Sequence, residues 1–230
     1  MTGSIAWLLA AAAVFVGSHI VLSGTGLRSV IVGAIGERPF LGLFSLVSIA
    51  AIVWVAAAYN DAPFVHLWEA GHLLKGLAWL VMLPAVWLLV CGLSTPNPTA
   101  IGAERLIEKG DAARGIFTAT RHPVMWSFAL WALAHVLSNG DLASLILFGG
   151  LALLVFAGLA SQELKKQTKL GEAWTRFTAK TSFLPFAAIL AGRTRLDHAG
   201  IGWMRLGATV AVYAALVLLH PWAIGVSPVP

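Results

Sequence analysis

Charged residues are scarce in this 230-residue chain: they make up 11% of it, whereas hydrophobic residues make up 59%. A water-soluble domain carries about 25% charged residues, so the composition excludes an ordinary globular protein. The single cysteine, Cys91, excludes an internal disulfide and a cysteine-based zinc site. The chain also has no phosphate-binding glycine loop, no dinucleotide fingerprint and no His-Glu-x-x-His sequence.

Long apolar runs are what the chain does have. A run of about 18 or more apolar residues is typical of a transmembrane helix. We therefore expect one domain over residues 1–230, an all-α polytopic membrane bundle of about six transmembrane helices with short interfacial helices on the cytoplasmic side. The expected transmembrane helices cover residues 5–23, 39–58, 72–93, 123–138, 142–161 and 203–222, and an interfacial helix covers 27–35.

The basic residues gather on one side of this expected bundle. With the N-terminus outside the cytoplasm, all of the 15 lysines and arginines except Lys75 fall on the inner side, most of them in two polar connections at 94–120 and 161–202. Positive charge marks cytoplasmic loops, so we expect a multi-pass protein of the bacterial inner membrane with both termini in the periplasm. This distribution explains the net charge of +5 and indicates membrane lipid, not nucleic acid, as the partner.

Two histidines lie inside apolar helices, His19 in "VFVGSHIVLSG" and His135 in "WALAHVLSN". An ionisable residue inside the bilayer is rare and usually functional, and neutral imidazole is the commonest metal ligand. Paired histidines on different helices are a recurrent way to hold haem in a helical bundle. The sequence therefore predicts an iron site on His19 and His135, with Trp131 in the wall of the cofactor pocket. His66, His198 and His220 are expected to be interfacial or solvated.

The start of the fourth expected transmembrane helix has the sequence Arg121-His122-Pro123. Proline at the first helical position makes His122 the expected N-cap. The free amides of a helix start, with Arg121 beside them, favour an anion such as a haem propionate. We therefore expect Arg121 and His122 to contribute to cofactor binding.

Depth along the helices leaves the ligand pair open. His19 is about 6 Å from the inner end of its expected helix, whereas His135 is about 20 Å along its helix from His122. Two ligands of one iron need similar depth, so straight helices favour His19 with His122 over His19 with His135. Both pairs remain candidates at this point.

Three segments carry a resemblance to a known family: "GSHIVLSGTGLR", "STPNPTAIG" and "TRHPVMWSFALWALAHVLSNGD". They resemble the NnrU family of bacterial membrane proteins, which shares its domain with the ζ-carotene isomerases of plants and cyanobacteria, and the likeness covers about 5–222. It implies a haem-b protein with two ligand histidines, matched by His19 and His135, and a third histidine near the site, matched by His122.

For function, the resemblance implies two alternatives. One is a redox-controlled isomerase that turns a cis double bond of an apolar polyene into trans, with His122 and His135 as catalytic residues and ferrous iron as the active form. The other is a factor tied to nitrite and nitric oxide reduction, with a respiratory or denitrification partner in the membrane. The residues leave open whether the chain is catalytic.

A more distant likeness concerns "RHP" followed by "SQELKKQTKLGEAWTRFTAKTSFLPF". It is similar to the end of isoprenylcysteine carboxyl methyltransferases, but Val-Met-Trp-Ser follows the proline and Gln162 replaces an acidic residue. This implies shared architecture, with an S-adenosylmethionine methyltransferase built on Arg121, His122 and Glu163 as an alternative function. A non-catalytic assembly factor for a respiratory reductase, docking through the two polar connections, is the other alternative.

Overall fold

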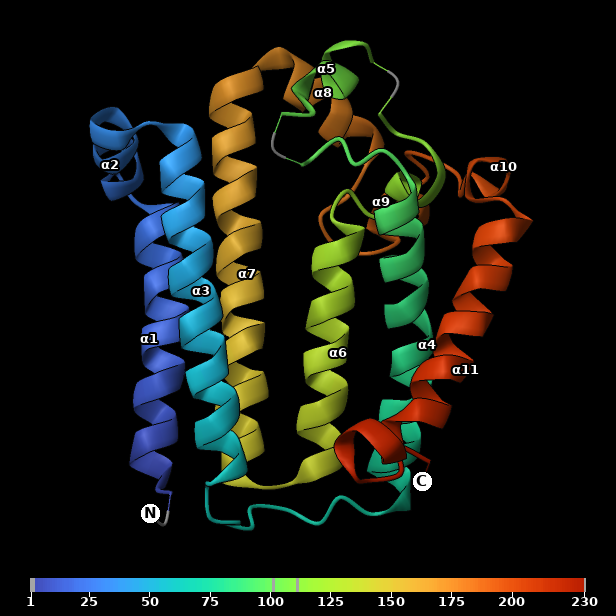
Figure 1. Ribbon diagram of the computed structural model, residues 1–230. Coiled ribbons are helices and arrows are strands. Elements are labelled where there is room, and N and C mark those ends of the chain that lie inside the picture. The colour runs from blue at the N-terminus through green and yellow to red at the C-terminus, as the bar shows by residue number, and fades with distance from the viewer. Residues whose placement is uncertain (1–2, 101, 111, 230) are drawn as a thin grey trace.

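A computed structural model describes residues 3–100, 102–110 and 112–229, and within these ranges the chain is helical with no β-strand. Long helices run side by side, and short helices and loops cover one end of the bundle (Figure 1). The elements are α1 (Ile5–Gly24), α2 (Leu27–Ile35), α3 (Glu37–Asn60), α4 (His72–Ser94), α5 (Glu104–Glu108), the 3₁₀ turn η1 (Gly115–Thr118), α6 (Pro123–Asn139), α7 (Leu142–Leu170), α8 (Glu172–Lys180), α9 (Ala187–Leu190), α10 (His198–Ile201) and α11 (Trp203–Ile224).

Five of these helices, α1, α3, α4, α7 and α11, are long and apolar enough to cross a membrane. The sixth expected span, α6, has 17 residues and lies at the short end of the range that crosses a bilayer. The prediction of an all-α bundle of about six helices is confirmed. Its boundaries differ by a few residues: α3 begins at Glu37, before Pro39, because proline is tolerated in the first helical turn.

Close helix packing rests on small side chains. Helices α1, α3 and α7 pack together, α6 packs against α7 and α4, and α11 packs on the outside of α4 (Figure 1). Alanines let backbones approach closely in a membrane, where helices gain no hydrophobic driving force from each other. The core among α1, α3 and α7 consists of Leu8, Ala11, Phe15, Ala51, Val55, Ala58 and Ala143.

Large apolar side chains cover the outside of the bundle. Trp203, Met204 and Trp222 on α11 are each more than 85% exposed, which a water-soluble protein would not tolerate as part of a continuous apolar surface. Lipid is the solvent that such a surface requires. The structure therefore supports lipid contact around the long helices.

Both termini lie at one end of the bundle, and the two polar connections lie at the other (Figure 1). The connections are ordered: α5 and η1 form within the first, and α8, α9 and α10 form within the second. Helix α7 extends past the expected end at residue 161 to Leu170 and reaches this cap. The predicted basic connections thus gather on one side, and which side is cytoplasmic stays a prediction.

The turn between α6 and α7 follows the sequence "NGD". Gly140 takes the left-handed conformation, with φ 72°, that ends α6, and Asp141 caps α7 by accepting a hydrogen bond from the Ser144 amide at 2.9 Å. The Gly140 carbonyl accepts hydrogen bonds from the amides of Leu67 and Trp68. This turn therefore fixes the loop between α3 and α4 to the end of the bundle, as the capping pattern predicts for the two helices themselves.

Replacing Gly140 by alanine should destabilise the protein. The left-handed conformation costs a residue with a Cβ about 1–2 kcal/mol, and here the added Cβ would also collide with the Trp68 carbonyl. We expect a lower midpoint of thermal unfolding in detergent. The matched control is Gly76→Ala in α4, where the added Cβ meets nothing within 4 Å; an equal loss in both variants would contradict this account of the turn.

Candidate functional site

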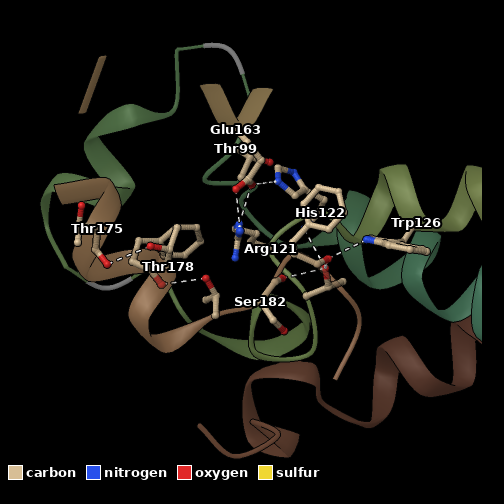
Figure 2. A network of polar contacts seen from close by, with 12 residues as sticks. Thr99, Arg121, His122, Trp126, Glu163, Thr175, Thr178 and Ser182 are labelled. Atoms are coloured by element: carbon tan, nitrogen blue, oxygen red, sulfur yellow. Dashed lines mark hydrogen bonds and ion pairs between the residues drawn. The ribbon is translucent and has the colours of Figure 1, made fainter. Parts of the chain in front are cut away.

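An ion cluster joins the start of α6 to the polar end of α7. The Arg121 guanidinium donates from Nε to Glu163 Oε1 and from Nη2 to Glu163 Oε2, both at 2.7 Å. His122 Nε2 donates to the same Oε1 at 2.5 Å. Figure 2 shows the carboxylate of Glu163 facing both basic side chains. A two-pronged arginine–carboxylate contact is among the strongest polar contacts in proteins.

Burial favours the neutral form of the His122 imidazole. Its side chain is fully buried, and this burial lowers its pKa, against the opposing hydrogen bond and negative charge of Glu163. Because a carboxylate only accepts hydrogen bonds, Nε2 carries the proton, and in the neutral ring Nδ1 keeps a bare lone pair. Nδ1 is buried and has no hydrogen-bond partner.

Neighbouring segments hold this cluster in place. The Arg121 amide donates to the Ser182 carbonyl at 3.0 Å, and Trp126 Nε1 donates to the Phe183 carbonyl at 2.8 Å (Figure 2). The ring of Trp174 lies 5.9 Å from the Arg121 guanidinium carbon, within range of a cation–π contact. The second polar connection is thus bound to the start of α6.

The sequence predictions for this segment have a mixed outcome. His122 is the N-cap residue of α6 with Pro123 at the first position, as predicted, although its side chain makes no capping hydrogen bond. In the structure the anion that Arg121 contacts is the carboxylate of Glu163. A role of Arg121 and His122 in cofactor binding stays a prediction.

A second ion cluster ties the first polar connection to α7. Lys166 Nζ lies 3.0 Å from Glu104 Oε1 and donates to the Ala100 carbonyl, and Lys169 lies 3.1 Å from the same Glu104 oxygen. Hydrogen bonds from Lys166, then from the backbone and from Lys169, lower the pKa of Glu104 to about 2. These contacts hold α5 against the end of α7.

A cavity of about 270 Å³ lies towards the opposite end of the bundle, among α4, α6, α11 and residues 226–228; we call it cavity 1. Its wall is mainly apolar, and it is open on one side. It is lined by Lys75, Ala78, Trp79, Met82, Ala134, His135, Ser138, Asn139, Tyr213, Leu216, Val217, His220, Val226, Ser227 and Pro228. An apolar pocket with a few polar groups is the usual form of a small-molecule site.

Two imidazoles lie close together in the wall of cavity 1. The ring centres of His135 and His220 are 6.5 Å apart, with 33° between the ring planes. His135 Nδ1 donates to the Trp131 carbonyl, and His220 Nδ1 donates to the Val226 carbonyl, each at 2.8 Å. In both neutral rings Nε2 is therefore the nitrogen with a free lone pair.

His19 lies elsewhere. It lines a different cavity of about 330 Å³, which we call cavity 2, together with residues of α1 and α7. Its ring packs against Phe15 and Phe44, and its Nδ1 donates to the Phe15 carbonyl at 2.8 Å. Cavities 1 and 2 share no lining residue, so the predicted pair His19–His135 is not brought together, and its ligand role stays a prediction.

The described side chains fit a haem better in cavity 1 than in cavity 2. Cavity 1 is lined by two imidazoles, His135 and His220, whose ring centres are 6.5 Å apart, whereas among the described residues His19 is the one histidine that lines cavity 2. Trp131, predicted in the pocket wall, packs against the His135 ring at 4.8 Å and is not itself a lining residue. No cluster of three or more metal-ligating side chains occurs within the described part of the chain.

Fold and sequence agree on the class: this is a polytopic helical membrane protein with an ion cluster at one end and a histidine-lined cavity at the other. The chain belongs to the NnrU family, whose model "NnrU protein" matches residues 7–228.

Curated relatives are chloroplastic 15-cis-zeta-carotene isomerases. That of Zea mays is 27% identical over 70% of this chain and 45% of its own length, and that of Arabidopsis thaliana is 29% identical over 78% of this chain and 50% of its own length. The chain thus spans about half the length of the curated relatives it matches. No solved structure matches it.

Removing the charge of Glu163 should destabilise the fold. In Glu163→Gln the buried Arg121 loses its counter-ion, and breaking a buried pair costs about 3 kcal/mol or more. The Tm in detergent should fall by several degrees. The control is Glu172→Gln, whose side chain is 96% exposed next to Arg176 and whose loss should cost less than about 1 kcal/mol. Equal Tm values for the two variants would show that the cluster does not brace the bundle.

Acid should release the first polar connection. The pKa of Glu104 is lowered to about 2, so the stability from its lysine contacts is present above about pH 4.5 and is lost as the pH falls towards 2. We expect faster hydrogen exchange in residues 102–110 over this window, after correction for the intrinsic exchange rate. Glu104→Gln should exchange fast at every pH, whereas Glu108→Gln, at an exposed position of α5, should behave as the wild type. An unchanged pH response in Glu104→Gln would refute this.

Proposed function

We propose that this protein is a haem-b-binding membrane isomerase that converts a cis double bond of an apolar polyene into trans, with His135 as an iron ligand. The observation that carries the proposal is cavity 1, a largely apolar cavity in which His135 presents a free ring nitrogen. The similarity to 15-cis-zeta-carotene isomerases supplies the reaction and the substrate class.

In this proposal, some residues around cavity 1 contact the substrate and others hold the His135 ring in place. Ala78, Met82 and Leu216 offer apolar contacts to a hydrocarbon chain. Trp131 and Phe148 pack against the ring of His135, and the hydrogen bond from Nδ1 to the Trp131 carbonyl fixes its tautomer. When bound, haem would supply an iron that interacts with a double bond of the substrate and lowers its barrier to rotation.

One predicted site residue and one predicted role remain untested by the contacts at cavity 1. His122, a predicted catalytic residue, lies in the ion cluster with Glu163 rather than in the lining of cavity 1. Its Nδ1 is buried and has no hydrogen-bond partner, and a catalytic role of His122 remains a prediction. The role in nitrite and nitric oxide reduction, with its respiratory partner, likewise remains a prediction.

We further propose the bacterial inner membrane as the location, with both termini in the periplasm. The support is the separation of the termini from the basic polar connections along the bundle (Figure 1), since positive loops stay in the cytoplasm. Cavity 1 would then lie near the periplasmic face, and the ion cluster near the cytoplasmic face.

An S-adenosylmethionine methyltransferase is the second candidate, because Arg121, His122 and Glu163 do meet in the structure. Both carboxylate oxygens of Glu163 are already engaged by Arg121, and one of them also by His122, so the carboxylate is not free for a ligand. Calorimetric titration of S-adenosylmethionine to millimolar concentration decides this candidate: measurable binding would favour it, and none would remove it.

The visible spectrum of protein purified from haem-replete bacterial cells tests the main proposal. We expect a haem absorption band, and conversion of a 15-cis carotenoid to the trans form by the reduced protein, with at least a tenfold loss of both in His135→Ala. The control is His66→Ala, since His66 is an exposed loop residue outside cavity 1. A colourless wild type, or full haem content and activity in His135→Ala, would overturn the proposal.

A further inference from the structure

We propose that cavity 1 also binds a single-chain carboxylic acid, a hydrocarbon chain whose anionic end is held by the ammonium of Lys75. This inference goes beyond the proposed isomerase function, because the apolar polyene of that proposal has no charged end. It depends on the residues around cavity 1 and uses neither the iron nor the identity of its ligands.

Lys75 carries an uncompensated positive charge. It lines cavity 1 and has no hydrogen-bond or ion-pair partner among the described residues. No aspartate or glutamate lines the cavity within the described part of the chain, and the nearby Glu69 lies 3.1 Å from His66. The other lysines and arginines belong to segments at the capped end of the bundle (Figure 1). An anionic group is therefore the complement that this end of the cavity lacks.

The position of Lys75 along α4 adds to this charge. Lys75 is the fourth residue of the helix, where the positive end of the helix dipole disfavours a cation and favours an anion. The N-cap residue, Gly71, makes no side-chain capping hydrogen bond. The helix start and the ammonium therefore act in the same direction on a bound carboxylate.

Helix α4 continues from this charge into an apolar wall. Ala78, Trp79 and Met82 follow Lys75 at spacings of three, four and seven residues, so all four side chains lie on one face of the helix. All four line cavity 1. Met82 lies about 10 Å deeper along the helix axis than Lys75, which gives a hydrocarbon chain a continuous surface.

Helices α6 and α11 repeat the same order of polar and apolar groups. Both start at the capped end, opposite to α4 (Figure 1), so Asn139, the last residue of α6, lies at the same end as Lys75. Ala134 on α6 and Leu216 and Val217 on α11 line the cavity further from this end. The cavity thus has donors at one end and hydrocarbon walls beyond them, as an amphiphile requires.

The size of the cavity limits the ligand to one chain. Its volume is about 270 Å³, at the small end of the range of about 300–1,000 Å³ for ligand pockets. One lysine balances one negative charge. A fatty acid, with one chain and one charge, therefore fits better than a phospholipid with two chains.

The test compares the binding of cis-parinaric acid, a conjugated fatty acid that quenches tryptophan emission, with that of its uncharged methyl ester. Full-length protein in nanodiscs of phosphatidylcholine is titrated at about pH 9, where the acid is ionised and lysine keeps its charge. Specific binding is the part of the quenching that excess oleic acid reverses. We expect the acid to bind about tenfold more tightly than the ester, because a hydrogen bond between charged groups contributes at least this much.

Four variants separate the charge from the apolar wall. Lys75→Gln should bind the acid only as tightly as the ester, whereas Lys75→Arg should keep the preference. Leu216→Trp should weaken both ligands about equally, because it fills the apolar part of the cavity, and Leu216 is 47% exposed, so the larger ring does not disturb the core. Lys109→Gln, at an exposed position of the capped end, is the matched control and should behave as the wild type.

The inference and the proposed function fail in different experiments. Equal affinities of the wild type for acid and ester, or an unchanged preference in Lys75→Gln, would overturn the inference while leaving haem binding and isomerisation intact. A colourless wild type that still prefers the acid through Lys75 would overturn the haem-dependent function and leave this inference standing.

Discussion

An imidazole inside an apolar helix bundle must satisfy its ring N–H, because no water is available to do so. This chain solves the problem in the same way three times. His19, His135 and His220 each donate Nδ1–H to a backbone carbonyl, of Phe15, Trp131 and Val226 respectively. The consequence is that each ring keeps Nε2 as a free electron pair donor, so the fold creates three prepared ligands and the packing of helices decides which of them meet.

Helix packing separates the first of these rings from the other two. Helix α1 packs with α3 and α7, so His19 shares its cavity with α7. Helix α11 packs on α4, which packs on α6, so His220 and His135 share a cavity. The ion pair of Arg121 with Glu163 links α6 to α7 at the other end of the bundle. The histidine-lined cavity and the polar cluster are therefore at opposite ends of α6, and the chemistry at one does not require the other to open.

Local sequence signals predicted much of this arrangement. Pro123 after His122, and the turn Asn139-Gly140-Asp141, set helix ends that the structure confirms. Apolar run length predicted the spans, because a helix in lipid must satisfy all of its backbone internally. The ordered α5 was missed, since it depends on a partner distant in sequence, Lys166 for Glu104. The start of α3 at Glu37 was missed because the expected helix begins at Pro39, whereas proline is tolerated throughout the first turn.

The site was predictable only in part, for the same reason. His135 stood out because it is ionisable and surrounded by apolar residues, whereas His220 was expected to be interfacial or solvated because it lies near a helix end. Counting from the starts of the two helices places His135 12 residues along α6 and His220 17 residues along α11, a difference of about 7.5 Å, so depth alone did not predict that their rings lie close together. Nothing in the sequence predicted that the Val226 carbonyl would accept a hydrogen bond from His220, because that contact depends on how the chain turns at Gly225 after α11.

The central claim is that a haem binds at cavity 1 with His135 as a ligand of its iron, and a density map of the haem-loaded protein tests it most directly. The account predicts porphyrin density in the cavity among α4, α6 and α11, with the iron bonded to Nε2 of His135. Iron density beside His19, or a cavity filled only by lipid in a protein that carries haem elsewhere, would contradict it.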